Sequence, residues 1–233
     1  MEALARLGGS IAHDIRNHLT VIKGFAEILQ RMALVSGDGG DMLAEILIAT
    51  GRAEAVTAKL LAFSRKGMLY AEVVDLSDTV RDLRGELGDA LGPAVRLHVV
   101  CESGRQPVWV EPNELRQTVM RLARNSAEAM PDGGELRITV RPADDASTVA
   151  RRHEGFQADR AVVLEVADTG TGMDAETASK AFEPFFSTKP AGEGLGLAMA
   201  YGFIRQSGGA VEVSSVPGKG TTVWIFLPVA ADE

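Results

Sequence analysis

The 233-residue sequence has a single cysteine, Cys101, and only 5% aromatic residues. One cysteine excludes a disulfide within the chain, which is typical of a protein from a reducing compartment. The longest wholly apolar stretches are a few residues long, far short of the roughly 20 residues that a membrane-spanning helix needs. The N-terminus also lacks the pattern of a secretory signal peptide. We therefore expect a cytoplasmic protein, or the cytoplasmic part of a longer or membrane-bound one.

The sequence also lacks a run of basic residues, and its formal net charge at pH 7 is -8. A nucleic-acid-binding protein needs a concentrated basic surface, so we expect no nucleic-acid partner. With 45% hydrophobic and 24% charged residues, the composition is that of an ordinary globular protein. The length allows one large domain or two small ones.

The first part of the chain has the periodicity of helices that pack against helices. Apolar residues recur at steps of three and four from about Glu2 to Val35, and the glycine-rich stretch 36–40, "SGDGG", predicts a turn. A second helix is expected from about Met42 to Ser64, where the apolar positions follow a seven-residue repeat. A helical hairpin leaves an apolar seam exposed, so a second copy should complete a four-helix bundle. We therefore expect a homodimer.

Within the first helix, the stretch Ser10–Leu19 reads "SIAHDIRNHL" and combines two histidines with an acid, an arginine and an asparagine. His18 falls on the apolar stripe, whereas His13 points about 200° away from its nearest apolar neighbours. Asn17 lies one turn beyond His13 on the same face. An exposed histidine with an adjacent carboxylate could act as a nucleophile. From these ten residues alone, however, a solvated helix face is the favoured interpretation.

Beyond Gly67 the helical period stops, and alternating or β-branched runs predict strands. This pattern predicts an α/β sandwich with helices on one face of the sheet. The polar span 142–159 has no period and is predicted to be a long exposed loop. We therefore divide the chain into a helical hairpin (1–67), a linker (68–75) and an α/β domain (76–233). The expected strands are 94–100, 107–111, 135–141, 161–167, 210–215 and 222–228, and the expected helices are 76–91, 113–130 and 197–206.

Two glycine-rich segments stand out in the α/β part. The segment "VADTGTGMD" (Val166–Asp174) directly follows a predicted strand, and "GEGLGLAMA" (Gly192–Ala200) has glycines at alternate positions before a predicted helix. Such a loop lets backbone N–H groups and a helix N-terminus approach phosphates, although Asp and Gly clusters after strands are usually only turns. Between them lies "AFEPFFSTKP" (181–190), and upstream a predicted helix carries "RLARNSAEAM" (121–130).

In this order and spacing, the four segments resemble the N box, first glycine box, phenylalanine box and second glycine box of bacterial sensor histidine kinases. That ATP-binding domain is shared with gyrase, Hsp90 and MutL. The stretch "AHDIRNHL" resembles the phospho-acceptor H box of the kinases, which excludes the other three branches. The resemblance extends from about residue 2 to residue 228. It implies an α+β fold, in which a dimeric four-helix bundle of N-terminal helical hairpins is followed by an α/β sandwich of the Bergerat type.

The resemblance also implies a role for each matching residue. His13 would accept the γ-phosphoryl group of ATP, Asp14 would orient or deprotonate its imidazole, and Asn17 would orient a water that hydrolyses an aspartyl phosphate. Asn125 would bind Mg²⁺ through its side-chain oxygen, and Asp168 would accept a hydrogen bond from the adenine amino group. The other expected nucleotide-site residues are the glycines near the base or the triphosphate (Gly170, Gly172, Gly192, Gly194 and Gly196), the phenylalanines that hinge a lid (Phe182, Phe185 and Phe186), the phosphate contact Lys189, Leu197, and Thr222 or its neighbour Thr221 in support of Asp168.

Three features depart from the family pattern. Arg121 stands where the N box usually has a second asparagine, His18 replaces a common proline, and the lid between Lys189 and Gly194 is short. Arg121 adds a cation one turn from Asn125, so it could reach the phosphates or crowd the metal.

The sequence thus predicts a sensor histidine kinase core that uses ATP and Mg²⁺. It would phosphorylate itself on His13, pass the phosphoryl group to an aspartate of a response regulator receiver domain, and also dephosphorylate that receiver. The expected partners are a second copy of the chain, the receiver, and a sensor domain N-terminal to this fragment. The alternative is a degenerate core that serves as a nucleotide-binding or phosphotransfer scaffold. Arg121 favours that alternative, whereas the nearly intact boxes oppose it.

Overall fold

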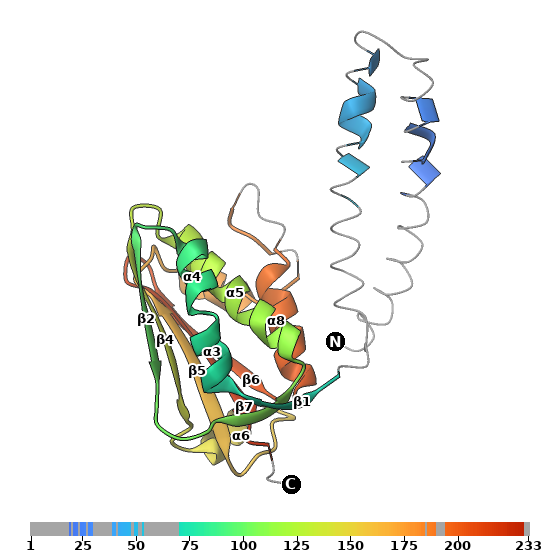
Figure 1. Cartoon of the computed structure of the whole chain (residues 1–233). Helices are drawn as coiled ribbons and strands as arrows, with labels where there is room; N and C mark the ends of the chain where they lie inside the picture. Colours follow the sequence, from blue (N-terminus) through green and yellow to red (C-terminus); the bar gives the residue numbers. More distant parts are fainter. Residues whose placement is uncertain are drawn as a thin grey trace. The chain divides into compact units, whose positions relative to one another are not determined.

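The computed structural model divides into two compact units, Met1–Met68 and Leu69–Glu233, which are considered separately (Figure 1). The residues that the structure describes are 19, 21–22, 24–26, 28–29, 39–40, 42–47, 49–50, 53, 70–184, 186–189 and 194–230.

In the first unit every described residue is helical. Gly39 and Gly40, the end of the predicted turn, are already helical, so the second helix begins earlier than predicted. Ala26 and Leu43 are buried, whereas the side chain of Phe25 is 65% exposed. One face of this unit is therefore covered while a second apolar face stays open. Among the described residues, no helix is both long enough and apolar enough to cross a membrane.

The second unit is built on a mixed five-stranded sheet with the order β2-β4-β5-β7-β6. The edge strand β2 runs parallel to β4, and the other neighbouring pairs are antiparallel. A separate two-stranded ribbon is formed by β1 and β3, and β1 lies within the stretch expected to be a linker. The strands are β1 (Glu72–Asp75), β2 (Val95–Cys101), β3 (Pro107–Val110), β4 (Gly134–Pro142), β5 (Ala161–Asp168), β6 (Ala210–Val216) and β7 (Gly220–Pro228).

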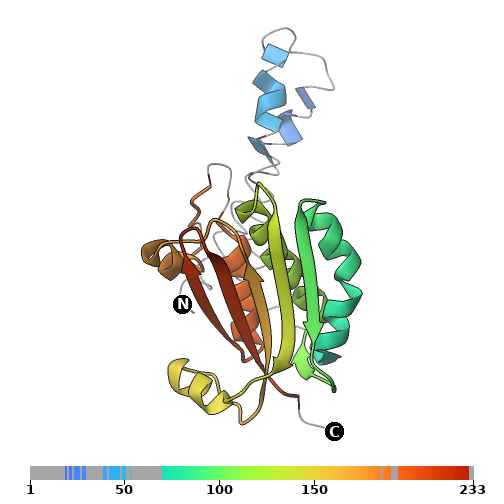
Figure 2. The ribbon, with the colours of Figure 1, turned by 90° about the vertical axis from the view of Figure 1, so that its left-hand side faces the viewer.

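Four helices cover one face of this sheet, as the two views of the ribbon show (Figures 1 and 2). They are α3 (Leu76–Asp82), α4 (Arg84–Leu91), α5 (Pro112–Ala129) and α8 (Gly196–Gln206). Leu115, Val119 and Leu122 recur at helical spacing on α5 and are buried against the sheet. The α/β sandwich expected from the sequence is confirmed.

The predicted helix 76–91 is two helices, because the backbone turns at Leu83. That residue has ψ of -8°, ends α3 and begins α4. Its side chain is fully buried in the main core. The apolar pattern runs through the turn without a break, so the sequence did not reveal the division.

The predicted exposed loop 142–159 is also wrong in part, because it contains a helix and a buried anchor. Helix α6 (Ala146–Arg152) packs at the helix-free side of the sheet (Figure 2). Phe156 is 2% exposed and forms a small second core with Val149 and Ala161. The N-cap, Asp145, accepts hydrogen bonds from the backbone N–H of Thr148 and from the hydroxyls of Ser147 and Thr148. A segment with few apolar residues thus gains order from one phenylalanine and one cap.

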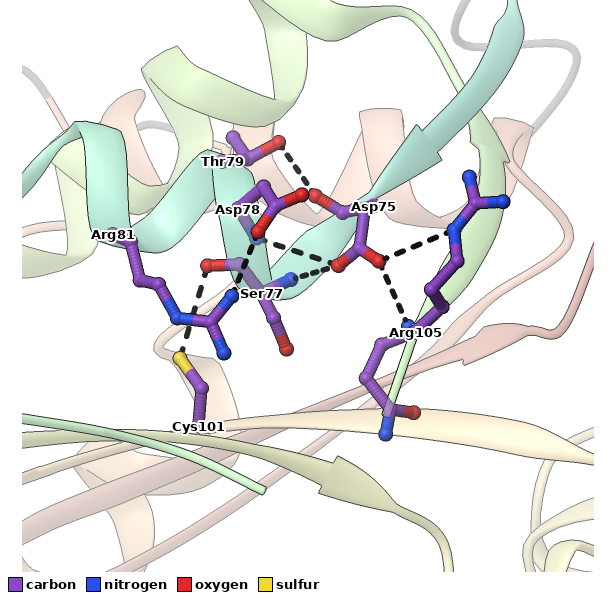
Figure 3. A network of polar contacts seen from close by, with 8 residues as sticks. Asp75, Ser77, Asp78, Thr79, Arg81, Cys101 and Arg105 are labelled. Carbon is purple, nitrogen blue, oxygen red and sulfur yellow. Dashed lines mark hydrogen bonds and ion pairs between the residues drawn. The ribbon is translucent and has the colours of Figure 1, made fainter. Parts of the chain in front are cut away.

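One carboxylate joins the first elements of the second unit to the segment before β3 (Figure 3). Asp75 Oδ1 accepts hydrogen bonds from the backbone N–H groups of Ser77 (2.9 Å) and Asp78 (3.3 Å), which caps α3. Asp75 Oδ2 accepts from the backbone N–H of Gln106 (3.2 Å) and lies 3.8 Å from Arg105 Nε. The side chain of Asp75 is only 11% exposed, and it connects β1, α3 and the residues before β3.

Candidate nucleotide-binding site

Helix α5 brings the N-box residues to the end of β5. The helix begins at Pro112, and Glu111 caps it by accepting hydrogen bonds from the backbone N–H groups of Asn113 and Glu114. Because its apolar stripe is fixed on the sheet, the last turns place Ser126 against β5. The Ser126 hydroxyl donates a hydrogen bond to Asp168 Oδ2 at 3.0 Å.

Asp168, the last residue of β5, is held by three donors. Its Oδ1 accepts from the backbone N–H groups of Gly170 (2.9 Å) and Thr221 (3.1 Å), and its Oδ2 accepts from Ser126. Each carboxylate oxygen can accept about two hydrogen bonds. Oδ1 is therefore saturated, and Oδ2 retains one acceptor position. That position fits one donor of a ligand, such as the amino group of adenine.

The support from the last strands comes from Thr221 rather than from Thr222. Thr221 pairs with Asp168 in the sheet register, whereas Thr222 pairs with Ala167. Because Val223 faces the helix-covered core, the alternation of β7 directs Thr222 to the other side of the sheet.

The loop after β5 passes so close to other backbone that glycine is required. A Cβ at Gly170 would lie 2.7 Å from the carbonyl oxygen of Ala129, and one at Gly172 would lie 2.1 Å from that of Val216. Gly172 also has a positive φ of 64°. The backbone N–H of Thr171 donates to the carbonyl oxygen of Ala129 (2.9 Å), and its carbonyl oxygen accepts from the backbone N–H of Gly218 (2.7 Å). These glycines thus fit the loop between α5 and the β6–β7 hairpin.

Two residues of this hairpin were missed by sequence reasoning. Gly220 has a φ of 93°, and a Cβ there would lie 1.9 Å from the carbonyl oxygen of Asp168. The Ser215 hydroxyl accepts from the backbone N–H of Met173 (2.7 Å) and lies 2.8 Å from Thr221 Oγ1. The "GKG" pattern before the last strand was a signal for Gly220, whereas no sequence signal marked Ser215.

Asp174 begins α7 (Ala175–Lys180) at the end of the first glycine box. The backbone N–H of Thr177 donates to its carboxylate at 2.7 Å. Hydrogen bonds from the backbone and the hydroxyl of Thr177 lower the pKa of Asp174 below its usual value. This end of the loop is therefore held by a charged helix cap.

Asn125 precedes Ser126 on α5 and is half-buried. Its side chain makes no hydrogen bond to another described residue, so its amide oxygen is available to a hard cation. In the part of the chain that the structure describes, no group of three or more His, Cys, Asp or Glu side chains could hold a metal ion. Mg²⁺ commonly takes one or two protein oxygens and completes its shell with phosphate oxygens and water. A single asparagine beside a nucleotide site fits that pattern.

Arg121 is directed toward the N-terminal half of α5. Its Nη2 donates to Gln117 Oε1 at 2.7 Å, and its Nη1 lies 3.5 Å from Glu114 Oε2. Both partners lie one or two turns before Arg121, whereas Asn125 lies one turn after it. In this arrangement the guanidinium is held away from the expected metal position.

Lys189 and Glu128 form an ion pair that connects the segment after the phenylalanine box to α5. Glu128 lies one turn beyond Asn125, so the Lys189 ammonium is held near the expected phosphate region. Phe182 packs against the main core, with its ring centroid 5.7 Å from that of Tyr201 on α8. The Phe186 backbone N–H donates to Glu183 O.

The start of α8 has room and donors for an anion. Gly194 has a positive φ of 64°, and the position of a Cβ on Gly196 has no atom within 4 Å. Leu195, the N-cap, makes no side-chain capping bond, so the first backbone N–H groups of α8 are open to a ligand. Leu197 is half-buried against the core. His13, Asp14, Asn17, Phe185 and Gly192 lie outside the described residues.

Comparison with known proteins identifies two family domains in the chain. Residues 110–231 match the family described as histidine kinase-, DNA gyrase B- and HSP90-like ATPase. Residues 3–68 match the His Kinase A (phospho-acceptor) domain.

Individual relatives match nearly the whole chain. The sensor kinase CckA of Brucella abortus (strain 2308) is 41% identical over 237 residues, which cover 100% of this chain and 25% of CckA. The sensor histidine kinase ZraS of Klebsiella oxytoca is 31% identical, over 99% of this chain and 47% of ZraS. The chain thus spans between a quarter and a half of the length of these relatives.

Solved structures agree with the fold. The structure of full-length ShkA in complex with AMPPNP matches with a TM-score of 0.69 at 22% identity, over 97% of this chain and 46% of ShkA. The Acinetobacter baumannii histidine kinase AdeS matches with a TM-score of 0.58 at 18% identity, over 94% of this chain and 98% of that chain. Since a phospho-acceptor domain here precedes an ATPase domain of the histidine kinase type, the chain belongs to the sensor histidine kinases and is a catalytic core of that family.

Proposed function

We propose that this chain binds ATP with Mg²⁺ and transfers the γ-phosphoryl group to His13. The phosphoryl group then passes to an aspartate of a response regulator receiver domain. The observation that carries the proposal is Asp168: its three protein donors leave one acceptor position on Oδ2, and one of those donors, Ser126, directly follows Asn125 on α5.

Each part of the site has a separate task in this proposal. Asp168 accepts a hydrogen bond from the adenine amino group, and the open N-terminus of α8 donates to phosphate oxygens. Asn125 would hold Mg²⁺, and the bound ion would neutralise part of the phosphate charge. Lys189 would exchange Glu128 for a phosphate oxygen, and this exchange costs little because both side chains are about half exposed.

The chemistry at the acceptor follows from the residues of the H box. A neutral imidazole is nucleophilic near physiological pH, and the adjacent Asp14 would fix its tautomer and raise its basicity. A ring nitrogen of His13 forms the new bond to phosphorus as the bond to the departing ADP oxygen breaks. The other ring nitrogen carries the proton, which Asp14 accepts or stabilises.

The proposed partners follow from the two units. A second copy would cover the open apolar face of the first unit, where Phe25 and Ile46 are exposed. The receiver would dock near His13. A sensor domain belongs to a longer protein, and the use of ATP and a receiver favours a cytoplasmic location.

Arg121 was the feature that favoured a degenerate scaffold. Its contacts with Glu114 and Gln117 account for the cation without placing it at Asn125. This arrangement supports an active kinase over a scaffold.

The test is incubation with radiolabelled ATP and Mg²⁺, followed by acid and base treatment. The wild type should acquire label that is acid-labile and base-stable, as a phosphohistidine is. His13→Gln should lose the label and still bind ADP, whereas the matched variant His18→Gln should keep the label. A wild type that binds ADP but never acquires label would instead support the scaffold.

The same H box supports a second activity toward the phosphorylated receiver. Asn17 lies one turn from His13, and its amide can both donate to and accept from a water. In the same assay, Asn17→Ala should retain the label and lose most of the dephosphorylation of the receiver. Equal dephosphorylation by the wild type and Asn17→Ala would restrict the chain to kinase and phosphotransfer activity.

A further inference from the structure

Ser126 is the one described side chain that donates a hydrogen bond to Asp168. It is 5% exposed, lies next to Asn125 on α5, and its Oγ is 3.0 Å from Asp168 Oδ2. The other two donors, Gly170 and Thr221, act through backbone N–H groups. Substitution at Ser126 therefore changes the hydrogen bonding of the carboxylate without altering the backbone around it.

We infer that Ser126 is a positioning and selectivity residue of the nucleotide site, and this inference rests on the proposed ATP function. With Oδ1 saturated, the Ser126 hydroxyl occupies one of the two acceptor positions of Oδ2. The remaining position has a single direction in which a ligand donor can reach it. Ser126 thus converts a carboxylate with two open positions into a recognition point for one amino group.

The chemistry of purines makes this a selective arrangement. A 6-amino group donates to the remaining position of Oδ2, whereas a 6-oxo group presents an acceptor to an acceptor. The Ser126 hydroxyl could donate to a 6-oxo group only by giving up its hydrogen bond to Oδ2. Asp168 Oδ2 would then lie against the 6-oxo oxygen with no hydrogen between them. Such an unpaired contact is costly at the half-buried carboxylate of Asp168. The carboxylate of Asp168 therefore favours adenine over guanine, and Ser126 strengthens this preference by holding Oδ2 in position for the 6-amino group.

A cycle of protein variants and nucleotide analogues tests this role. Binding of ADP and of purine riboside 5′-diphosphate, which lacks the 6-amino group, is measured by calorimetry with the wild type and Ser126→Ala. We expect Ser126→Ala to bind ADP about five- to tenfold more weakly, because the carboxylate of Asp168 loses the donor that holds Oδ2 in the direction of the 6-amino group. We expect its affinity for the analogue to change less than about twofold, because the analogue has no group that Asp168 recognises. The preference for ADP over GDP should also fall.

Ser207→Ala is the matched control. The Ser207 hydroxyl is half-buried and donates to the Phe203 carbonyl oxygen at the end of α8. That end lies by the start of β6, whereas Asp168 pairs with Thr221 at the opposite end of the sheet. Ser207→Ala should bind both nucleotides as the wild type does.

The outcomes separate this inference from the proposed function. An equal loss for ADP and the analogue would show that Ser126 only supports the fold, and an unchanged affinity for both would remove it from the site. If Ser126→Ala does not fold, Ser126→Cys keeps the shape with a weak donor and should show the same selective loss. A wild type that binds neither nucleotide would overturn the proposed ATP site itself, and with it the role of Ser126.

Discussion

At Asp168, two backbone N–H groups and one hydroxyl converge on a single carboxylate. Only an acceptor can meet all three donors, so the charge and the two oxygens of aspartate are both needed. The geometry also distinguishes the two oxygens, because the protein saturates Oδ1 whereas Oδ2 keeps one acceptor position for the proposed ligand. A single residue at the end of a strand thus holds the local structure and, in the proposed function, recognises the nucleotide.

We predict that Asp168→Asn weakens ADP binding by about 30-fold or more. The amide nitrogen must face either the backbone donors of Gly170 and Thr221 or the ligand amino group, and either contact opposes two donors. A lost charge-assisted hydrogen bond with an unpaired donor costs on the order of 2 to 3 kcal/mol. Calorimetry measures the affinity, with Asp145→Asn as a control that changes the cap of α6 outside the candidate nucleotide site. An unchanged affinity in a folded Asp168→Asn protein would exclude Asp168 from the site.

On the scale of elements, the polar residues of α5 have different partners according to their position along the helix. Arg121, in the middle of the helix, contacts Glu114 and Gln117 in the N-terminal turns. The C-terminal turns present Asn125 and Ser126 toward the nucleotide site. Because the apolar stripe fixes the helix on the sheet, the sequence position of each polar residue determines which group it can reach.

We predict that Arg121→Asn leaves the Mg²⁺ dependence of nucleotide binding unchanged, since the guanidinium is engaged by Glu114 and Gln117. ADP affinity is measured with and without Mg²⁺ for the wild type and the variant. Arg124→Asn, an exposed neighbour on the same helix, is the matched control. If Arg121→Asn selectively weakened binding in the absence of Mg²⁺, the guanidinium would reach the phosphates after all.

The junction of β1 and α3 gives a second prediction at this scale. Asp75→Ala should lower the free energy of unfolding of the second unit by about 1 to 3 kcal/mol, because it leaves backbone N–H groups of Ser77 and Gln106 without an acceptor. Asp78→Ala is the control, since the side chain of Asp78 is exposed and its one contact among the described residues is the ion pair with Arg81, while its backbone N–H is kept in the variant.

Urea unfolding followed by tryptophan fluorescence measures the Asp75→Ala effect in the full chain. Both tryptophans, Trp109 and Trp224, belong to the second unit, so the signal reports that unit alone. Equal midpoints for Asp75→Ala and Asp78→Ala would mean that the carboxylate of Asp75 does not hold the junction.

On the scale of the whole molecule, the two units differ in how completely they bury their apolar side chains. The second unit encloses a continuous core between its sheet and four helices. The first unit leaves large apolar side chains exposed, among them Val21, Phe25 and Met42. A helical unit with an open apolar face is completed by association with another apolar face.

We therefore predict a dimer that Phe25→Lys dissociates, because the ammonium would be buried without a partner in the interface. Sedimentation measures the mass of the wild type and the variant across a range of concentrations. Trp109→Lys is the control, since Trp109 is 55% exposed but lies in the second unit. A monomeric wild type, or dissociation by Trp109→Lys alone, would refute this assignment of the interface.

The sequence by itself determined most of the strands of the second unit and its longest helix. The strands β2, β4, β5 and β7 and the helix α5 follow from apolar periodicity, which is a local property that each segment carries alone. The positive φ of Gly172 is also a local property of a tight loop, whereas Gly170 is needed because its backbone passes close to Ala129. The family resemblance then grouped residues that are far apart in the chain.

Only the tertiary structure decided which side chains meet. The Ser126–Asp168 bond joins residues 42 positions apart, and the choice of Thr221 over Thr222 depends on the register of β5 and β7. The burial of Phe156 depends on the strands beneath it. From the sequence, Arg121 could have contacted either an acidic side chain or the phosphates. Its contact with Glu114 depends on how the side chains pack. Local patterns specify elements, whereas contacts between distant residues are fixed only when packing sets the register and orientation of those elements.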